Sequence, residues 1–217
     1  MGKKKVVILD FDGTLYSSDH VFDKIDNFIV RHRREFLPNI TDEDYAKIVK
    51  DYPEWKKTFA ATEIVEYLYL FKKKYPEMQI SIKDFYDWQD AHPDPLVLDD
   101  VKIANQKFLK ELCEEFPTYI VSNSPPNHIE HYMKKLNIEP EWFKKIYSNH
   151  FIARDRSKKH YYEEIIKKEE CKPKDVYVFG DSVQNDLEPA KELGINVCFV
   201  NKANRLKNEI LKVLKPE

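Results

Sequence analysis

The stretch VVILDFDGTLYSS, residues 6–18, decides how the chain can fold. Four apolar residues, Val6–Leu9, lead directly into Asp10 and Asp12, and Gly13 follows at once. A short, continuously apolar run is typical of a strand that is buried on both faces of a parallel sheet. Two interpretations of its acidic end are open. Either the aspartates form a solvated strand end closed by an Asp-Gly turn, or they hold a cation and take part in a reaction.

Other apolar runs repeat this pattern further along the chain, and segments with helical periodicity lie between them. This alternation of strand and helix, from about residue 98 to the end, predicts an α/β fold with a doubly wound parallel sheet. The further strands are expected at Thr118–Val121, Val176–Phe179 and Asn196–Val200, with a weaker one at Ile146–Tyr147. The helical patterns cover Val101–Phe116, Ile129–Leu136, Tyr161–Ile166, Val183–Leu193 with Gly194 as its C-cap, and Leu206–Leu214.

The segment from residue 17 to 97 breaks the alternation and has helical periodicity throughout. Thr41, followed three residues later by Asp44, resembles a helix start, and the pair Pro93 and Pro95 is typical of a linker. We therefore expect two parts: an α/β core made of residues 1–16 and 98–217, and an all-helical module, residues 17–97, inserted after the first strand.

Composition excludes several functional classes. The chain has 217 residues and a net charge of −2, which gives no electrostatic case for nucleic acid or an acidic membrane surface as a partner. No run approaches the ~18 apolar residues of a membrane span. Three widely spaced cysteines favour reduced thiols and a cytoplasmic protein. The sequence does not indicate an oligomeric state.

Polar side chains follow three of the expected strands. Asp10 and Asp12 end the first, Ser122 and Asn123 end the second, and Asp181 opens the turn after a later strand, with Asp186 beyond it. Ligands of open α/β sheets bind outside the carboxyl ends of the strands, so these groups would share one crevice. Crowded carboxylates need a cation, and oxygen ligands without histidine or cysteine suit Mg²⁺. Bound Mg²⁺ in turn favours phosphate chemistry.

These motifs together resemble the haloacid dehalogenase-like (HAD) superfamily of phosphohydrolases. DFDGT at 10–14 resembles its first motif, Ser122 its second, a lysine after Arg156 its third and GDSVQND at 180–186 its fourth. The resemblance covers the α/β part and implies a Rossmann-like core. The insert lies where the C1 caps of the superfamily lie, although its sequence matches no particular cap.

The resemblance implies roles for the aspartates. Asp10 would be the nucleophile that forms an aspartyl-phosphate, and Asp12 the general acid for the leaving oxygen and then the base for water. Mg²⁺ would be held by Asp10, by the backbone carbonyl of Asp12 and by Asp181. Asp186 would support the metal through water or through contacts with its ligands.

The resemblance also implies a phosphate-binding set: Thr14, Ser122, the backbone of Asn123 and a lysine that lets two anions approach. The third motif often reads Lys-Pro, and this chain departs from it. Lys158 fits the spacing to the following helix, and Lys159 is the alternative.

The leading hypothesis is a Mg²⁺-dependent phosphatase that hydrolyses a small phosphorylated metabolite through an aspartyl-phosphate. A phosphomutase on the same core is one alternative. A nucleotide-specific 5′-nucleotidase is another, because the first motif runs into Leu15 and Tyr16 as it does in the pyrimidine-nucleotidase branch. A non-catalytic binding module that keeps the fold is a third. The identity of the substrate is left open.

Overall fold

The computed structural model describes residues 5–17, 35, 37, 39–59, 75–77, 91, 102–124, 126–148, 157–200 and 202–215; for residues 17, 49, 52–59, 102, 103 and 128 it describes the backbone alone. The chain forms two compact units, one made of Met1–Ser18 with Val101–Glu217 and the other of Asp19–Asp100. The first unit contains every strand of the main sheet.

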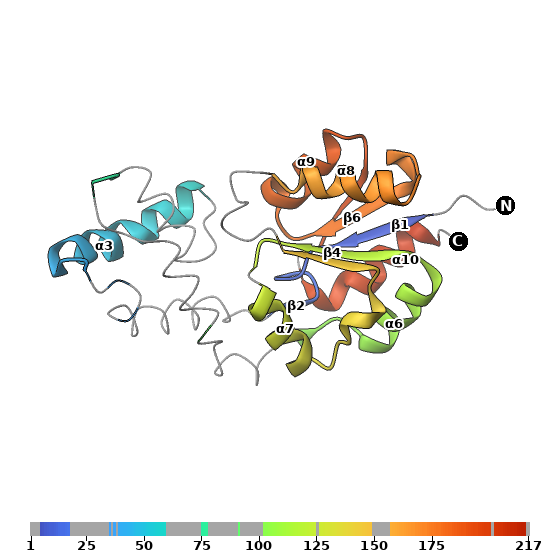
Figure 1. Ribbon diagram of the computed structural model, residues 1–217, viewed down its shortest axis with the longest axis horizontal. Coiled ribbons are helices and arrows are strands. Elements are labelled where there is room, and N and C mark those ends of the chain that lie inside the picture. The colour runs from blue at the N-terminus through green and yellow to red at the C-terminus, as the bar shows by residue number, and fades with distance from the viewer. Residues whose placement is uncertain are drawn as a thin grey trace. The chain divides into compact units, whose positions relative to one another are not determined.

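The main sheet has five parallel strands in the order β5-β4-β1-β6-β7 (Figure 1). The chain runs from the central strand β1 outwards through β4 and β5, and then returns to the other side of β1 for β6 and β7. This order confirms the doubly wound α/β fold, including the weaker strand. The strands span Val6–Leu9 (β1), Thr118–Ser122 (β4), Lys145–Ser148 (β5), Val176–Gly180 (β6) and Asn196–Phe199 (β7).

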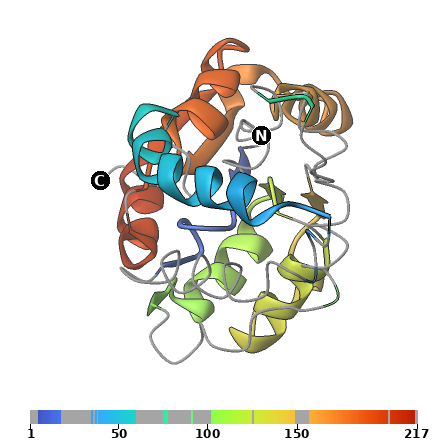
Figure 2. The ribbon, with the colours of Figure 1, turned by 90° about the vertical axis from the view of Figure 1, so that its left-hand side faces the viewer.

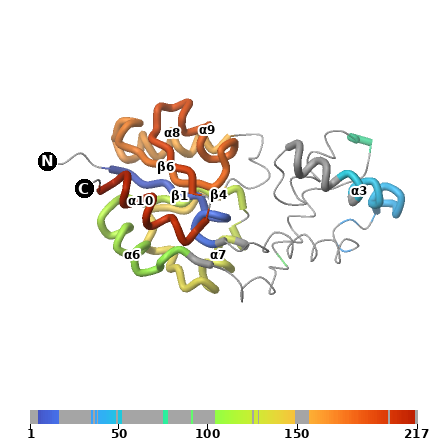
Figure 3. The backbone as a smooth tube through the Cα atoms, turned by 180° about the vertical axis from the view of Figure 1, so that it is seen from behind, coloured from blue at the N-terminus to red at the C-terminus, as the bar shows by residue number. Residues whose placement is uncertain are grey.

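Helices cover both faces of this sheet. Seen from the front and from behind, α8 and α9 lie on one face and α6, α7 and α10 on the other (Figures 1 and 3). The helices span Gln106–Glu115 (α6), Pro126–Lys135 (α7), Lys159–Lys168 (α8), Glu188–Lys191 (α9) and Leu206–Leu214 (α10). Short 3₁₀ helices lie at Pro140–Trp142 (η1), Pro173–Asp175 (η3) and Ala203–Arg205 (η5).

The continuous apolar character of β1 follows from its central position. Val6 and Ile8 belong to a core cluster that also contains Tyr162 and Ile165 of α8. Successive strand residues point to opposite faces, so the equally buried Val7 and Leu9 point to the other layer of helices. A strand buried on both faces has no solvated side to carry polar residues, and its first polar residues therefore come only where it ends.

Two strands were not predicted from the sequence. Tyr16–Ser17 (β2) and Lys102–Ile103 (β3) pair antiparallel in a separate two-stranded ribbon. The helical prediction for Val101–Phe116 is therefore wrong at its start. The helix begins later because Asn105 caps it, accepting a hydrogen bond from the backbone N–H of Phe108 at 2.9 Å.

The helix predicted at Val183–Leu193 is interrupted. Its first part is a π-helical turn, Val183–Leu187 (η4), and only its second part is α-helical. The oxygen of the Ser182 side chain caps the turn by accepting a hydrogen bond from the N–H of Asn185 at 3.1 Å. Gly194 ends the segment at a φ of +75°, as expected for a C-cap glycine. Single π-turns of this kind are frequent at functional sites.

In the second unit the structure describes one long helix, Asp42–Phe59 (α3), drawn in blue to cyan in Figure 2. It begins where the sequence predicts, since the Thr41 hydroxyl accepts a hydrogen bond from the N–H of Asp44 at 3.1 Å. The other helices expected between residues 17 and 97, and the linker at Pro93 and Pro95, lie almost wholly outside the described residues. The helical cap therefore stays a prediction. Among the helices described here, none is both long and apolar enough to cross a membrane.

Candidate active site

Three adjacent strands carry the candidate residues to one edge of the sheet. β1 lies between β4 and β6, and Leu9 at its end is paired with Ile120 on one side and Phe179 on the other. The N–H of Asp10 still donates to the carbonyl of Phe179 at 2.9 Å. Asp10 therefore emerges between the ends of β4 and β6, where Ser122 and Asp181 also lie.

Asp10 is buried and tightly held. Only 7% of the surface of this residue is exposed. Lys158 donates to its Oδ1 from 2.8 Å, and the Thr14 hydroxyl donates to its Oδ2 from 3.1 Å. Thr14 reaches back because the chain makes a tight turn after the strand, in which the N–H of Leu15 donates to the carbonyl of Phe11 at 2.9 Å. Two of the residues predicted to bind phosphate, Thr14 and Lys158, are thus in contact with the predicted nucleophile.

Lys158 joins two carboxylates. Its ammonium also donates to Oδ1 of Asp186 from 2.5 Å, and both partners of this pair are 2% exposed. The other oxygen of Asp186 accepts from the N–H of Ser182 at 2.9 Å. Gly180 makes this arrangement possible, because a Cβ there would lie 2.5 Å from Oδ2 of Asp186. The last residue of β6 must therefore have no side chain.

The sequence left Lys158 and Lys159 as alternatives, and the two lie in different environments. Lys159 points outwards and pairs with Glu192 at 2.9 Å, with 38% and 61% of these side chains exposed. Lys158 is the one that lies against Asp10.

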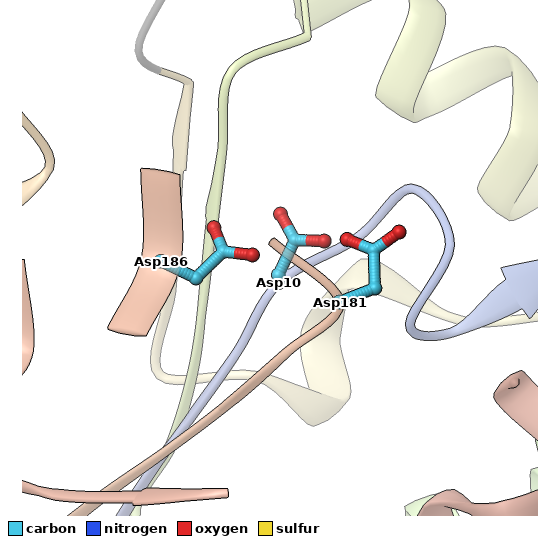
Figure 4. A group of neighbouring side chains, drawn as sticks. All are labelled: Asp10, Asp181 and Asp186. Carbon is cyan, nitrogen blue, oxygen red and sulfur yellow. The ribbon is translucent and has the colours of Figure 1, made fainter. Parts of the chain in front are cut away.

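Asp10, Asp181 and Asp186 form a cluster that fits a metal ion (Figure 4). Each offers one carboxylate oxygen, and these oxygens lie within 4.8 Å of one another. In Figure 4 Asp10 lies between the other two, and all three carboxylates open towards the same side. Gly13 is packed against the cluster at a φ of +78°, and a Cβ there would lie 2.0 Å from Oδ2 of Asp181. An oxygen-only donor set of this kind is the one that Mg²⁺ prefers.

The electrostatics of the cluster also fit a bound cation. Burial, and next the Asp186 carboxylate, raise the pKa of Asp10 well above its usual range, although Lys158 opposes this. Burial and Asp186 likewise raise the pKa of Asp181 to about 7. Burial alone would lower the pKa of Lys158, but the carboxylates of Asp10 and Asp186 outweigh it and hold that pKa well above its usual value. One ammonium thus compensates only part of the negative charge, and a divalent cation would favour the ionised carboxylates.

Asp12 lies in a different environment, among hydroxyl groups. Its Oδ2 accepts from Ser124 at 2.6 Å and from Ser122 at 3.2 Å, and its Oδ1 accepts from the hydroxyl of Tyr16. The Ser122 oxygen in turn accepts from the N–H of Ser124 at 3.0 Å. Asn123 lies between these two serines and is half-buried. The two aspartates of the first motif therefore have distinct partners: an ammonium and one hydroxyl for Asp10, and three hydroxyls for Asp12.

Two contacts of Asp12 were not expected from the sequence. Ser124 was visible only as part of a polar strand end, because β4 ends at Ser122 and the alternation of a strand does not extend beyond it. Tyr16 gave no signal, because its approach depends on the turn that brings β2 back beside Asp12 as an isolated bridge. Neither contact could be read from local spacing.

Comparisons with known proteins point to one family and one fold. A family model for haloacid dehalogenase-like hydrolases matches residues 4–194. No curated protein sequence matches the chain significantly. Among solved structures, a HAD phosphatase from Thermococcus onnurineus is 16% identical with a TM-score of 0.61, and the match covers 98% of this chain and 99% of the Thermococcus chain. A protein described as a predicted phosphoglycolate phosphatase from Haemophilus somnus is 16% identical with a TM-score of 0.57, covering 99% and 98%. YfnB from Bacillus subtilis, described as a putative HAD-hydrolase and solved with magnesium, is 16% identical with a TM-score of 0.54, and the match covers 92% of this chain and 90% of YfnB.

Proposed function

The chain belongs to the haloacid dehalogenase-like hydrolases, and on that premise we propose that it is a Mg²⁺-dependent phosphatase. It would release phosphate from a small phosphorylated metabolite, in the cytoplasm, through an aspartyl-phosphate intermediate. One observation carries the proposal: a buried carboxylate, Asp10, lies in contact with Lys158 and Thr14 and beside a second carboxylate, Asp12, that is held separately. The Thermococcus protein is named a phosphatase and the Haemophilus protein a predicted phosphatase, and both names are consistent with the proposal.

In the first step an oxygen of Asp10 attacks the phosphorus atom. A new P–O bond forms to the carboxylate, the P–O bond to the leaving oxygen breaks, and Asp12 gives its proton to that oxygen. Lys158 lowers the repulsion between the carboxylate and the phosphate, both of which are anions. Ser122, Thr14 and the backbone of Asn123 would bind the phosphate oxygens.

In the second step water attacks the phosphorus of the aspartyl-phosphate. Asp12, now ionised, takes the proton of the water, and the P–O bond to Asp10 breaks to release inorganic phosphate. Mg²⁺ would be held by Asp10, Asp181 and the backbone carbonyl of Asp12, with Asp186 in support, and would supply charge neutralisation for the transferring phosphoryl group.

A panel of phosphate monoesters, assayed with and without Mg²⁺, tests the proposal. We expect phosphate release that depends on Mg²⁺ and disappears in Asp10→Asn, a variant that keeps the shape of the side chain but removes the nucleophile. No release from any ester, with Asp10→Asn indistinguishable from wild type, would contradict it. Analysis of the products distinguishes the phosphomutase alternative. Free phosphate excludes it, whereas an isomerised sugar phosphate would support it.

The nucleotidase alternative rested on Leu15 and Tyr16. Both are buried, with 0% and 2% of their surfaces exposed, so packing explains this pair without a nucleotide. Nucleoside monophosphates belong in the panel, and a clear preference for them would restore that alternative.

A further inference from the structure

Tyr16 contacts Asp12, the proposed acid/base residue, but has no role in the two steps given above. Its hydroxyl donates to Oδ1 of Asp12, whereas Ser122 and Ser124 donate to Oδ2. The two oxygens are therefore held from two elements, β2 on one side and the end of β4 on the other. We propose that Tyr16 is a positioning residue, which fixes the carboxylate plane of Asp12 for proton transfer to the leaving oxygen. This inference rests on the proposed phosphatase function.

The ring of Tyr16 is locked in place. It is 2% exposed and stacks on Tyr132 of α7, with ring centroids 4.9 Å apart and planes at 21°. Phe11 meets it edge-on at 5.3 Å and 69°. Aromatic pairs in these two arrangements are the favoured ones. The hydroxyl therefore has little freedom to leave Asp12 once the ring is packed.

The backbone fixes Tyr16 as well. It is paired with Ile103 in the β2–β3 ribbon and forms a bridge with Asp12 itself. The next connection along the ribbon, from the N–H of Ala104 to the carbonyl of Leu15, is 2.7 Å long. A group positioned by both its ring and its backbone can orient its neighbour closely, and small losses of orientation reduce rates strongly.

The role predicts a specific kinetic signature. Proton donation by Asp12 matters most when the leaving group is a poor one, such as an alkoxide, and little when it is 2,4-dinitrophenolate. Loss of the Tyr16 hydroxyl should therefore affect the two kinds of ester unequally. A merely structural role would reduce the turnover of both by the same factor.

The test compares Tyr16→Phe with wild type on ethyl phosphate and on 2,4-dinitrophenyl phosphate. The quantity measured is kcat/KM, which covers the steps up to departure of the leaving group and excludes hydrolysis of the aspartyl-phosphate. General acid catalysis contributes roughly 10²–10⁴-fold, and a mispositioned acid loses part of it, so we expect kcat/KM for ethyl phosphate to fall about 10–30-fold. For the dinitrophenyl ester we expect a fall of less than about threefold, because the phenylalanine ring keeps its packing and the acid is hardly needed.

A double-mutant cycle separates action through Asp12 from any other effect. In the Asp12→Asn background, adding Tyr16→Phe should change kcat/KM for ethyl phosphate by less than about twofold, because the two residues act as one unit. Tyr119→Phe is the matched control: it removes another hydroxyl–carboxylate bond of a buried tyrosine, to Glu169, outside the site. That variant should leave the ratio between the two esters unchanged.

Three outcomes decide the matter. A selective loss on ethyl phosphate that vanishes in Asp12→Asn supports the role of Tyr16. An equal loss on both esters, or a loss that persists in Asp12→Asn, overturns it while leaving the phosphatase function intact. A wild-type protein that cleaves neither ester nor any member of the monoester panel removes the proposed function itself, and the role with it.

Discussion

Replacing Lys158 by methionine tests the contribution of the positive charge that joins Asp10 to Asp186. Methionine keeps most of the length and volume of lysine but leaves Asp10 and Asp186 facing each other without the ammonium between them. At N–O separations of 2.8 and 2.5 Å each pair has a gross attraction of about 6–7 kcal/mol at an effective dielectric constant of about 20. Desolvation of the buried ions offsets much of this attraction.

The net effect on stability should be a loss of about 3 kcal/mol, near the lower end for breaking a buried pair, because Asp10 can take up a proton. For a chain of this length such a loss lowers the melting temperature by roughly 6–12 °C. Burial and Asp186 already raise the pKa of Asp10, and without Lys158 that pKa rises further. A pKa raised above its unfolded value gives stability that is present at low pH and is lost as pH rises through the folded value. The difference in melting temperature from wild type should therefore be larger at pH 8 than at pH 5.

Activity should fall about 10²–10³-fold, the usual effect of removing one preorganised electrostatic group. Scanning calorimetry at the two pH values and a phosphate-release assay measure both quantities. Lys159→Met is the matched control, since its exposed pair with Glu192 is screened by water and its loss should change neither quantity. Equal effects of the two variants, or a stability difference that shrinks as pH rises, would refute the reasoning.

Three further predictions concern backbone space, metal and a thiol. Gly180→Ala should lower the free energy of unfolding by about 1–3 kcal/mol, because its Cβ would lie within 2.7 Å of three atoms of Asp186. In the control variant Gly194→Ala the Cβ meets nothing nearer than 4.0 Å, so this variant should lose only the ~1 kcal/mol that a positive φ costs an alanine. Urea unfolding measures the free energy of unfolding of both variants. Mg²⁺ at tenfold its dissociation constant should raise the melting temperature by about 3–6 °C, and Asp181→Asn should abolish this shift in a thermal-shift assay. Burial raises the pKa of the Cys113 thiol from 9.0 to about 11, so the stability of the folded protein should decline as pH rises between these values. Alkylation of Cys113 at pH 8, followed on its peptide by mass spectrometry, should be slow until the protein unfolds.

The parts of the fold that depend on local sequence were predictable. Val6–Leu9 predicts a central strand because a strand buried on both faces needs an unbroken apolar run. The placement of Asp10, Ser122 and Asp181 together follows from a rule about sheets rather than from spacing. Sequence alone could not choose between Lys158 and Lys159, because both fit a helix start and only packing decides which one is buried.

The parts that depend on contacts between distant segments were not predictable. β2 and β3 have two residues each, too short for periodicity to show, and their pairing joins residues 16–17 to 102–103. The π-turn after Ser182 reads as ordinary helix, because apolar spacing does not report a shift in hydrogen bonding. The contact of Tyr16 with Asp12 needs both the ribbon and the stack on Tyr132, and neither leaves a local signature.

The β2–β3 ribbon also bears on how such a chain can be modified. It brings Ser17 and Lys102 into register as partners, at the two points where the chain leaves and re-enters the first unit. An insertion whose ends already lie side by side places little constraint on the length of what is inserted, since closing it requires only a hairpin-like turn. Segments of very different size could therefore be exchanged at this position, by gene recombination or by design, while β1 and its aspartates keep their place in the sheet.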